Sequence, residues 1–394
     1  MNCKKVILKD FNVMSPVIPD GMDFEKTLFY PDENWEPNIQ FNIKKITKPI
    51  AKQVRRMNRT SSIAYVSSNS IMERNDFEGV DEHRFGIIFS THNSSLENVL
   101  RILRNLYEKG AEYVSPIDFS YSVGNSLLSG IAIKYGLKGP CSVLPSSDSL
   151  LLSRMVLQSG EADYILTGSF NICLDENLEF YRTLSHLNGD SDHFTKLLDE
   201  AEGSVVRELA VSMILESLEH SENSDEKKCY LSGFADIRAK VHNVARMNGE
   251  VNTYPISADA ELSMFSSEDF AKAMKIAMSD AEVKPEDIDA VFTCTCGNKS
   301  LDLEEYKAVI DTFNEDTELV AIQGIFGTNL GGNFMLNSAA AAVSLKNQCL
   351  PPTRGIFKEN TRFNMQKKDK KLKTILVNGY NDTGNIISGV WQWI

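Results

Sequence analysis

The sequence predicts an α/β protein in which helices and strands are arranged in layers. Short apolar runs rich in β-branched residues alternate with helical patterns of roughly 10 to 15 residues along the whole chain. In each half an acidic loop, GEAD at 160–163 and PEDID at 285–289, lies between a predicted helix and an apolar strand. This parallel favours two duplicated βαβαβ-type halves in a layered α-β-α-β-α architecture.

The first half contains three predicted strands and two predicted helices. KKVILKDF at 4–11 is a strand, and FGIIFST at 85–91 is a strand followed by the helix SLENVLRILRNLYEKG at 95–110. The helix SLLLSRMVLQSGEA at 149–162 precedes the strand DYILTGSF at 163–170. A helix directly followed by an apolar strand is typical of parallel sheets.

The second half repeats this alternation. FAKAMKIAMSDA at 270–281 is predicted as a helix before the strand DAVFTCT at 289–295. LDLEEYKAVIDTF at 301–313 is a helix before the strand ELVAIQG at 318–324, and TILVNGY at 374–380 is a further strand. The second half therefore has the same helix-to-strand order as the first.

The region between the halves does not resemble a linker between independent domains. Residues 186–228 are more polar than the rest, and SENSDEKK at 221–228 is predicted as a loop, but no flexible Gly- or Ser-rich stretch follows. We therefore predict one fused body made of a half at 1–240 and a half at 241–394.

Composition excludes several classes of partner. The net charge of the 394 residues is -13, which argues against nucleic acid or an anionic membrane, since both attract clustered Lys and Arg. The N-terminal apolar run is too short for a signal peptide, and no apolar segment approaches the roughly 18 residues of a membrane span. The odd number of Cys predicts reduced thiols and a cytoplasmic protein. They are at positions 3, 141, 173, 229, 294, 296 and 349.

Common catalytic and cofactor motifs are absent from the sequence. It contains no P-loop, no GxGxxG after a strand, no GxSxG and no HExxH. The pair Cys294 and Cys296 lacks a second ligand pair nearby, so we expect buried strand thiols, no metal and no cofactor. The glycine-rich GTNLGGN at 327–333 is open to two interpretations, an anion cradle at a helix start or, more in keeping with its surroundings, close packing against the core.

Five segments in order carry a family resemblance. They are VSPIDFSYSVGNSLLSGIAIKYGLKGP at 114–140, QSGEADYILTGSF at 158–170, GSVVRELAVSMILES at 203–217, VFTCTCGNKSLDLEEYKAV at 291–309, and GTNLGGN through LPPT at 327–353. In these segments the chain resembles the β-ketoacyl synthases of the thiolase fold. The resemblance implies a thiolase-like fold over almost the whole chain.

The resemblance also implies that the catalytic side chains have been replaced. In working synthases two histidines stabilise the oxyanion and the carbanion-like species, and a lysine precedes the second histidine. The matching positions here are Cys294, Thr328 and Gln323, and no His follows residue 242. No shift of register restores either histidine.

The position of the family nucleophile has two placements. Counting back from the GEAD loop by the family spacing gives Val143, whereas counting forward from Gly139 and Pro140 gives Asp148. The two counts differ because residues have been deleted from the nucleophile elbow, the turn near Val143, Ser147 and Asp148 that leads into the next helix. The serines here are predicted to cap the following helix. Cys141 is the nearest thiol, but it follows Pro140 directly and has no neighbouring base in sequence to activate it.

Among ketosynthase relatives, this pattern resembles the chain length factor, the ketosynthase β subunit of type II polyketide synthases. The resemblance implies a protein that is inactive by itself and forms a heterodimer with a catalytic ketosynthase. In that heterodimer it would shape the acyl tunnel of the ketosynthase, and acyl carrier protein would bind through the ketosynthase. Many chain length factors have Gln at the nucleophile position, and this chain does not. The candidates for tunnel or interface residues are Phe119, Ser120, Val123, Asn125 and Gly130.

Three alternatives stay open at this point. Relatives that serve aryl-polyene or other polyene pathways share the same pattern. An active acyltransferase or decarboxylase with a relocated nucleophile would form an acyl adduct when alone. A homodimeric scaffold that binds carrier protein would form a stable homodimer and ignore a ketosynthase partner.

Overall fold

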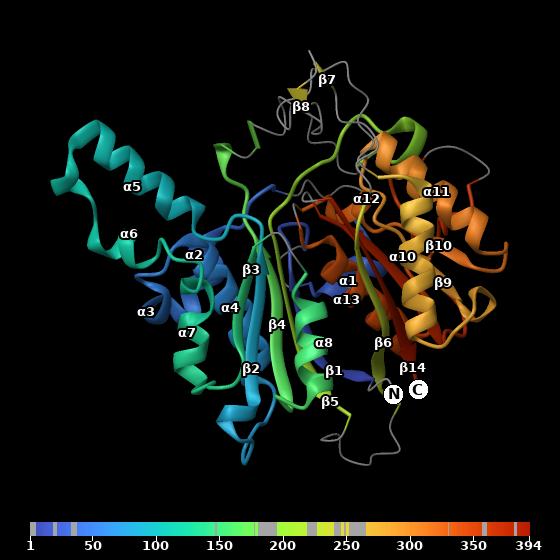
Figure 1. The fold of residues 1–394 in the computed structure, drawn as a ribbon, viewed down its shortest axis with the longest axis horizontal. Helices are drawn as coiled ribbons and strands as arrows, with labels where there is room; N and C mark the ends of the chain where they lie inside the picture. Colours follow the sequence, from blue (N-terminus) through green and yellow to red (C-terminus); the bar gives the residue numbers. More distant parts are fainter. Residues whose placement is uncertain are drawn as a thin grey trace.

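The protein is a layered α/β structure (Figure 1). In the computed structural model, ten strands form one sheet in the order β10-β9-β13-β14-β6-β1-β5-β4-β2-β3. The structure describes residues 5–18, 22–32, 38–145, 148–176, 178–179, 195–218, 227–239, 246–247, 250–251, 265–329, 331–356, 361–381 and 384–394.

The strands that the structure describes have the following bounds. They are β1 Val6–Met14, β2 Phe85–Thr91, β3 Cys141–Pro145, β4 Tyr164–Asn171, β5 Leu209–Ser217, β6 Cys229–Arg238, β7 Arg246–Met247, β8 Glu250–Val251, β9 Ala290–Phe292, β10 Glu318–Val320, β11 Cys349–Leu350, β12 Lys368–Asp369, β13 Thr374–Tyr380 and β14 Asn385–Trp393.

The described helices have the following bounds. They are α1 Phe24–Phe29, α2 Ile43–Thr47, α3 Ala51–Val54, α4 Arg59–Glu73, α5 Leu96–Lys109, α6 Pro116–Ser120, α7 Ser126–Tyr135, α8 Ser149–Ser159, α10 Ser267–Asp280, α11 Lys299–Thr312, α12 Gln323–Phe326 and α13 Asn333–Asn347.

The sheet consists of two five-strand sets with the same pairing pattern. In the first set β2 pairs in parallel with β3 and β4, and β5 pairs antiparallel with β4 and β1. In the second set β9 pairs in parallel with β10 and β13, and β14 pairs antiparallel with β13 and β6. The predicted duplication is therefore present in the strand order. The second set begins with β6, upstream of residue 240, so the division at 240 stays a prediction.

Three buried clusters fill the spaces between the layers. The central cluster joins α8 and α13 to strands of both sets, which places these two helices in the middle layer. A second cluster joins α4 and α7 to the outer face of the first set, and a third joins α10 and α11 to the outer face of the second set. Figure 1 shows these outer helices on opposite sides of the strands. The predicted α-β-α-β-α layering is confirmed.

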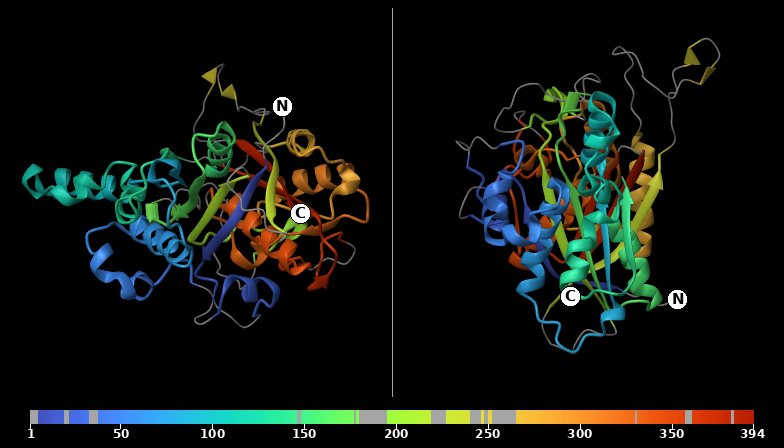
Figure 2. Two further views of the ribbon diagram at one scale, coloured as in Figure 1. Left: turned by 90° about the horizontal axis from the view of Figure 1, so that it is seen from below. Right: turned by 90° about the vertical axis from the view of Figure 1, so that its left-hand side faces the viewer.

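Helices α5 and α6 project from this body as an arm, as the left view of Figure 2 and the left side of Figure 1 show. The arm carries exposed apolar side chains, including Tyr107 (82% exposed) and Phe119 (68% exposed). A strongly amphipathic helix with an uncovered apolar side is typical of a surface that meets another molecule.

Among the helices of the described residues, none has both the length and the apolar character needed to cross a bilayer.

The two halves are connected by an ion pair between a buried arginine and a partly buried aspartate. Arg154 of α8, whose side chain is 6% exposed, donates from Nη1 to Oδ2 of Asp280 at the end of α10 (2.6 Å). Nη2 of Arg154 also donates to the carbonyl of Ser232 in β6 (3.2 Å). The pair therefore holds the middle layer against the outer helix of the second half.

Asp280→Ala should lower the free energy of unfolding by about 3 kcal/mol, because it leaves a buried guanidinium without its carboxylate. Urea unfolding followed by circular dichroism measures this change. Glu82→Ala is the control, since Glu82 pairs with Lys138 on the surface, where such pairs contribute less than about 1 kcal/mol. Equal losses in the two variants would contradict a special role for the buried pair.

Candidate functional site

The first turns of α13 bring the predicted catalytic segments together. The Ser149 hydroxyl, at the start of α8, lies 3.6 Å from the sulfur of Met335. Nδ2 of Asn337 donates to the carbonyl of Thr293, one residue before the Cys294 position (2.9 Å). The third segment, 327–332, leads directly into α13. The nucleophile elbow, the end of β9 and the 327–332 loop thus meet around one helix.

Of the two predicted elbow positions, Asp148 is the one that directly precedes α8. Val143 lies in the middle of β3 and pairs with Phe89, so it cannot start a helix. Asp148 directly precedes α8 with an extended backbone, and its Oδ1 accepts the amide hydrogen of Leu150 (2.7 Å). Ser147 lies outside the described residues. Cys141 is at the opposite end of β3 from the elbow.

The Asp148 carboxyl is buried, and only one of its two oxygens accepts a hydrogen bond. It is 3% exposed, and its Oδ2 has no hydrogen-bond partner. Burial, with a smaller contribution from the charge of Asp236 in β6, raises the pKa of Asp148 to about 7. A carboxyl that holds its proton near neutral pH is a poor nucleophile.

Two carboxylates of α11 hold the loop that follows β9. Glu305 accepts the amide hydrogen of Cys294 (2.9 Å) and a hydrogen from Nδ2 of Asn378 (2.9 Å). Asp302 accepts the amide hydrogens of Cys296 (2.8 Å) and Gly297 (3.0 Å). The loop is therefore fixed by backbone hydrogen bonds to two fully buried carboxyls.

Both thiols of this loop are neutral. Burial, and after it the charge of Glu305, raises the pKa of Cys294 well above its usual value. Burial raises the pKa of Cys296 to about 12, and its sulfur lies 3.2 Å from the Tyr380 hydroxyl. Since the thiolate is the reactive form of cysteine, these thiols behave as small buried side chains. Within the described residues no three His, Cys, Asp or Glu side chains gather as a metal site would require.

Thr328 uses its hydroxyl within its own loop. Its Oγ1 accepts a hydrogen bond from Nδ2 of Asn333 (2.8 Å), and its amide donates to the carbonyl of Val205 (2.8 Å). Its carbonyl accepts the amide hydrogen of Arg207 (2.9 Å). A hydroxyl held in this way shapes the loop but cannot act as the general base that a histidine supplies.

Gln323, predicted at the position of the family lysine, makes a neutral hydrogen bond to α13. Its Nε2 donates to Oδ1 of Asn337 (2.8 Å), the same residue that holds the end of β9. Its Oε1 is buried without a hydrogen-bond partner. The amide therefore links α12 to α13.

The predicted tunnel or interface residues lie away from this cluster. Phe119 and Ser120 end the arm at α6, Val123 is 52% exposed, and Asn125 is exposed before α7. Gly130 differs from these, because a Cβ at this position would lie 2.4 Å from the Met57 methyl group. Gly130 therefore faces α4 within its own chain, whereas the other four are open to the outside.

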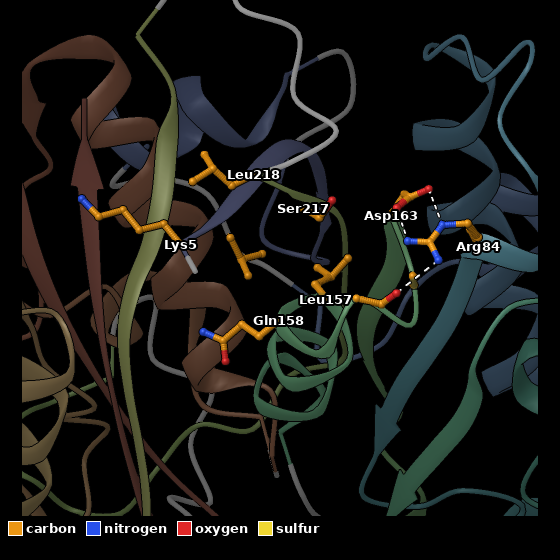
Figure 3. A pocket seen from close by; sticks show the side chains of 10 residues that line it. Lys5, Arg84, Leu157, Gln158, Asp163, Ser217 and Leu218 are labelled. Atoms are coloured by element: carbon orange, nitrogen blue, oxygen red, sulfur yellow. Dashed lines mark hydrogen bonds and ion pairs between the residues drawn. The ribbon is translucent and has the colours of Figure 1, made fainter. Parts of the chain in front are cut away.

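A small cleft elsewhere on the molecule is separate from the site. Figure 3 shows Leu157 and Gln158, from the last turn of α8, beside Lys5 and the ion pair of Arg84 with Asp163. The site surrounds the first turn of α8. The cleft is thus at the other end of this helix.

The comparisons with known proteins agree with this geometry. Residues 249–356 match the family model for the beta-ketoacyl synthase, C-terminal domain. The 3-oxoacyl-[acyl-carrier-protein] synthase 2 of Staphylococcus aureus is 24% identical over 317 residues, which cover 77% of this chain and 74% of the relative.

Two solved structures match along the whole length. The ishigamide ketosynthase/chain length factor superposes with a TM-score of 0.81 at 17% identity and covers 99% of both chains. A type II PKS acyl-carrier protein in complex with its ketosynthase bound to the hexaketide gives a TM-score of 0.79 at 16% identity, covering 99% of this chain and 100% of the other.

The chain has the thiolase-like fold of the ketosynthases. The fold prediction is confirmed, and the ketosynthase part of the predicted resemblance is supported. At these identities, similarity to the solved structures establishes the fold alone, so the finer identification as a chain length factor is taken up below as a proposal.

Several residues of this ketosynthase-like site were missed by sequence reasoning. Asn333 and Asn337 hold its loops from α13, and their spacing of four residues was the available signal. His92, after β2, lies beside the 327–332 loop, since a Cβ on Gly331 would be 3.9 Å from the His92 Cβ. It comes from a segment that carries no family motif, so no sequence pattern indicated that it lies here.

Asp148→Asn should remove a pH dependence of stability. In the wild type the folded carboxyl keeps its proton up to a pKa of about 7, whereas an unfolded Asp ionises near 3.9. The folded state binds the extra proton, so wild-type stability falls as pH rises from about 4 to about 7, by a few kcal/mol. Asn keeps the acceptor for Leu150 without the charge.

The difference in unfolding free energy between Asp148→Asn and wild type should therefore be small at pH 4, grow up to about pH 7 and then stay constant. Urea unfolding at each pH measures it. Asp23→Asn is the control, because Asp23 caps α1 from an exposed position through the amide of Lys26. A difference that does not vary with pH would contradict the burial of an unpaired carboxyl.

Proposed function

We propose that this chain is a non-catalytic ketosynthase-like subunit, a chain length factor that pairs with a catalytic ketosynthase in type II polyketide biosynthesis. The observation that carries the proposal is the chemistry at the family's catalytic positions. Cys294 is a buried neutral thiol, Thr328 holds its own loop, and Asp148 stands at the start of α8 with a raised pKa. These groups do not reproduce a thiolate beside two imidazoles.

The surface around β3 fits a partner of the same fold. β3 is the last strand of the sheet, and within the described residues its second edge has no strand partner. The helices on either face of this edge show large apolar side chains, Ile133 of α7 (81% exposed) and Met155 of α8 (56% exposed). An open strand edge flanked by apolar side chains favours pairing with another chain.

The printed descriptions of the structural neighbours support the same assignment. One is a ketosynthase/chain length factor, and the other is a ketosynthase in complex with an acyl-carrier protein. On the proposal, this subunit meets a carrier protein through its catalytic partner. On the proposal the catalytic partner sets the chemistry, so the assignment is to the subunit class and covers both aromatic and polyene pathways.

The isolated chain should neither condense nor decarboxylate malonyl thioesters. After incubation with malonyl- or acetyl-loaded carrier protein, intact-mass measurement should show the unmodified chain. Co-expression with a catalytic ketosynthase of the same organism should give a heterodimer that makes product. In that complex, Cys294→Ala, Thr328→Val and His92→Ala should each keep product formation within a few-fold of wild type.

Two results would replace this proposal with an alternative. A stoichiometric acyl adduct on the isolated chain, at Cys141 or at a serine from 146 to 149, would indicate an active acyltransferase with a relocated nucleophile. A stable homodimer that does not exchange with a ketosynthase would indicate a scaffold that binds carrier protein.

Enlarging an exposed residue beside the arm should shorten the product without breaking the heterodimer. We propose that Ser120 and Val123 help close the partner's acyl tunnel, since both are exposed, Ser120 at the end of α6 and Val123 shortly after it. Val123→Trp and Ser120→Phe in the heterodimer should give shorter chains by mass spectrometry at unchanged elution volume. Gly130 is unsuitable for this test, because added bulk there would clash with Met57.

Lys272→Trp on the outer helix α10 is the matched control and should leave chain length unchanged. If the Ser120 and Val123 variants lower yield without changing product length, the subunit is supportive only and does not shape the tunnel.

A further inference from the structure

A buried arginine beside the 327–332 loop lacks a counter-ion. Arg207 is 2% exposed, and its Nε and Nη1 have no hydrogen-bond partner. Burial lowers its pKa to about 10, which leaves the guanidinium charged at neutral pH. A buried charge without a partner is unfavourable by several kcal/mol, so such an arrangement is unusual in a folded protein.

The nearest carboxylate along the chain is already occupied. Glu208 receives two hydrogen bonds from Arg59, from Nε (2.9 Å) and from Nη2 (2.6 Å), and a third from the amide of Phe41 (2.7 Å). The Cys173 thiol interacts electrostatically with Arg207, but burial raises its pKa, so it supplies no negative charge. Within the described residues, Arg207 therefore has no anionic partner.

A second unpartnered donor lies on the same loop. Nδ2 of Asn329 is buried and makes no hydrogen bond. The orientation of this amide is fixed because its Oδ1 accepts hydrogen bonds from the amide of Gly332 (2.6 Å) and from Nδ2 of Asn171 (3.3 Å). The Asn329 NH2 group is therefore held in place with donors that nothing in the described protein uses.

The Arg207 side chain and Asn329 are held on either side of Thr328. The amide of Arg207 donates to the Thr328 carbonyl (2.9 Å). A Cβ on Gly327 would lie 2.9 Å from Nη1 of Arg207, so the guanidinium lies directly against the loop. Gly327 also has a φ of +70°, a conformation that favours glycine and leaves room for the arginine. The two groups with unused donors therefore belong to neighbouring backbone stretches that pair through Val206 and Thr328.

We propose that Arg207 and Asn329 form an oxyanion-binding site that takes a carboxylate or phosphate group. The planar guanidinium offers two parallel N–H donors in the geometry that these groups accept, and the Asn329 amide adds a neutral donor. The site lies beside Thr328, and the inference does not depend on whether the chain is catalytic.

Binding of simple anions to the full-length purified chain tests this site. Thermal unfolding is followed while sodium malonate or inorganic phosphate is titrated at constant ionic strength, with chloride as the balancing anion. At least one of the two should raise the Tm with saturation, as expected for a ligand that binds only the folded state. A response to malonate alone assigns the site to carboxylates, and a response to phosphate alone assigns it to phosphates.

Variants separate this site from general surface effects. Arg207→Met keeps the length of the side chain without the charge, so it should abolish the response and melt above wild type in chloride buffer. Asn329→Ala should weaken the apparent affinity by roughly tenfold, a change expected from the loss of one hydrogen bond to a charged group. Lys368→Met, which removes a surface cation paired with Glu318, should keep the full response.

The proposal is overturned if neither anion raises the Tm of wild type with saturation, or if Arg207→Met responds as wild type does. It is also overturned if Lys368→Met loses the response, because binding would then be a property of the surface. If Arg207→Met does not fold, the wild-type titration and Asn329→Ala decide the outcome.

Discussion

The structure depends on α13 being enclosed between the two strand sets. Each residue from Asn333 to Leu345 is buried, and the four alanines at its centre allow the flanking layers to approach closely. A helix buried on all sides leaves no solvent for its polar side chains, so these must bond within the protein. Asn333 and Asn337 meet this requirement by holding the 327–332 loop and the end of β9.

The support of the candidate site does not depend on the side chains at the positions matched to the catalytic histidines. Asp302 and Glu305 still fix the loop after β9 through backbone amides, and this requires carboxyl groups but no histidine. Cys294 and Thr328, at the positions matched to the histidines, are small uncharged side chains, so they are buried without the cost of a buried charge. The scaffold and the chemistry are thus separable: one resides in backbone hydrogen bonds and the other in a few side chains.

The sequence predicted the helices and strands better than the contacts between them. FGIIFST and TILVNGY coincide with β2 and β13, because strands buried on both faces are continuous apolar runs. Residues 186–228 are polar on average, and for this reason the central strand β5 within them was not predicted. Val143 and Asp148 were equal candidates for the elbow. Counting from the GEAD loop and counting from Gly139 and Pro140 give different positions when the loop between them has changed length. The unpartnered donors of Arg207 depend on contacts between distant segments, which no local pattern contains.

The interior around α13 and the open edge at β3 are physically connected, and on the proposed function this gives a non-catalytic subunit a reason to retain the whole scaffold. The position of β3 is set by its pairing with β2, and α8 packs against both β2 and β4. α8 is in turn placed by α13 and by the ion pair of Arg154 with Asp280. Loosening the former site would therefore shift α8 and with it the edge that we propose meets the partner. On this view the buried carboxyls and asparagines remain because they hold an interface, and the reaction itself is left to the other subunit.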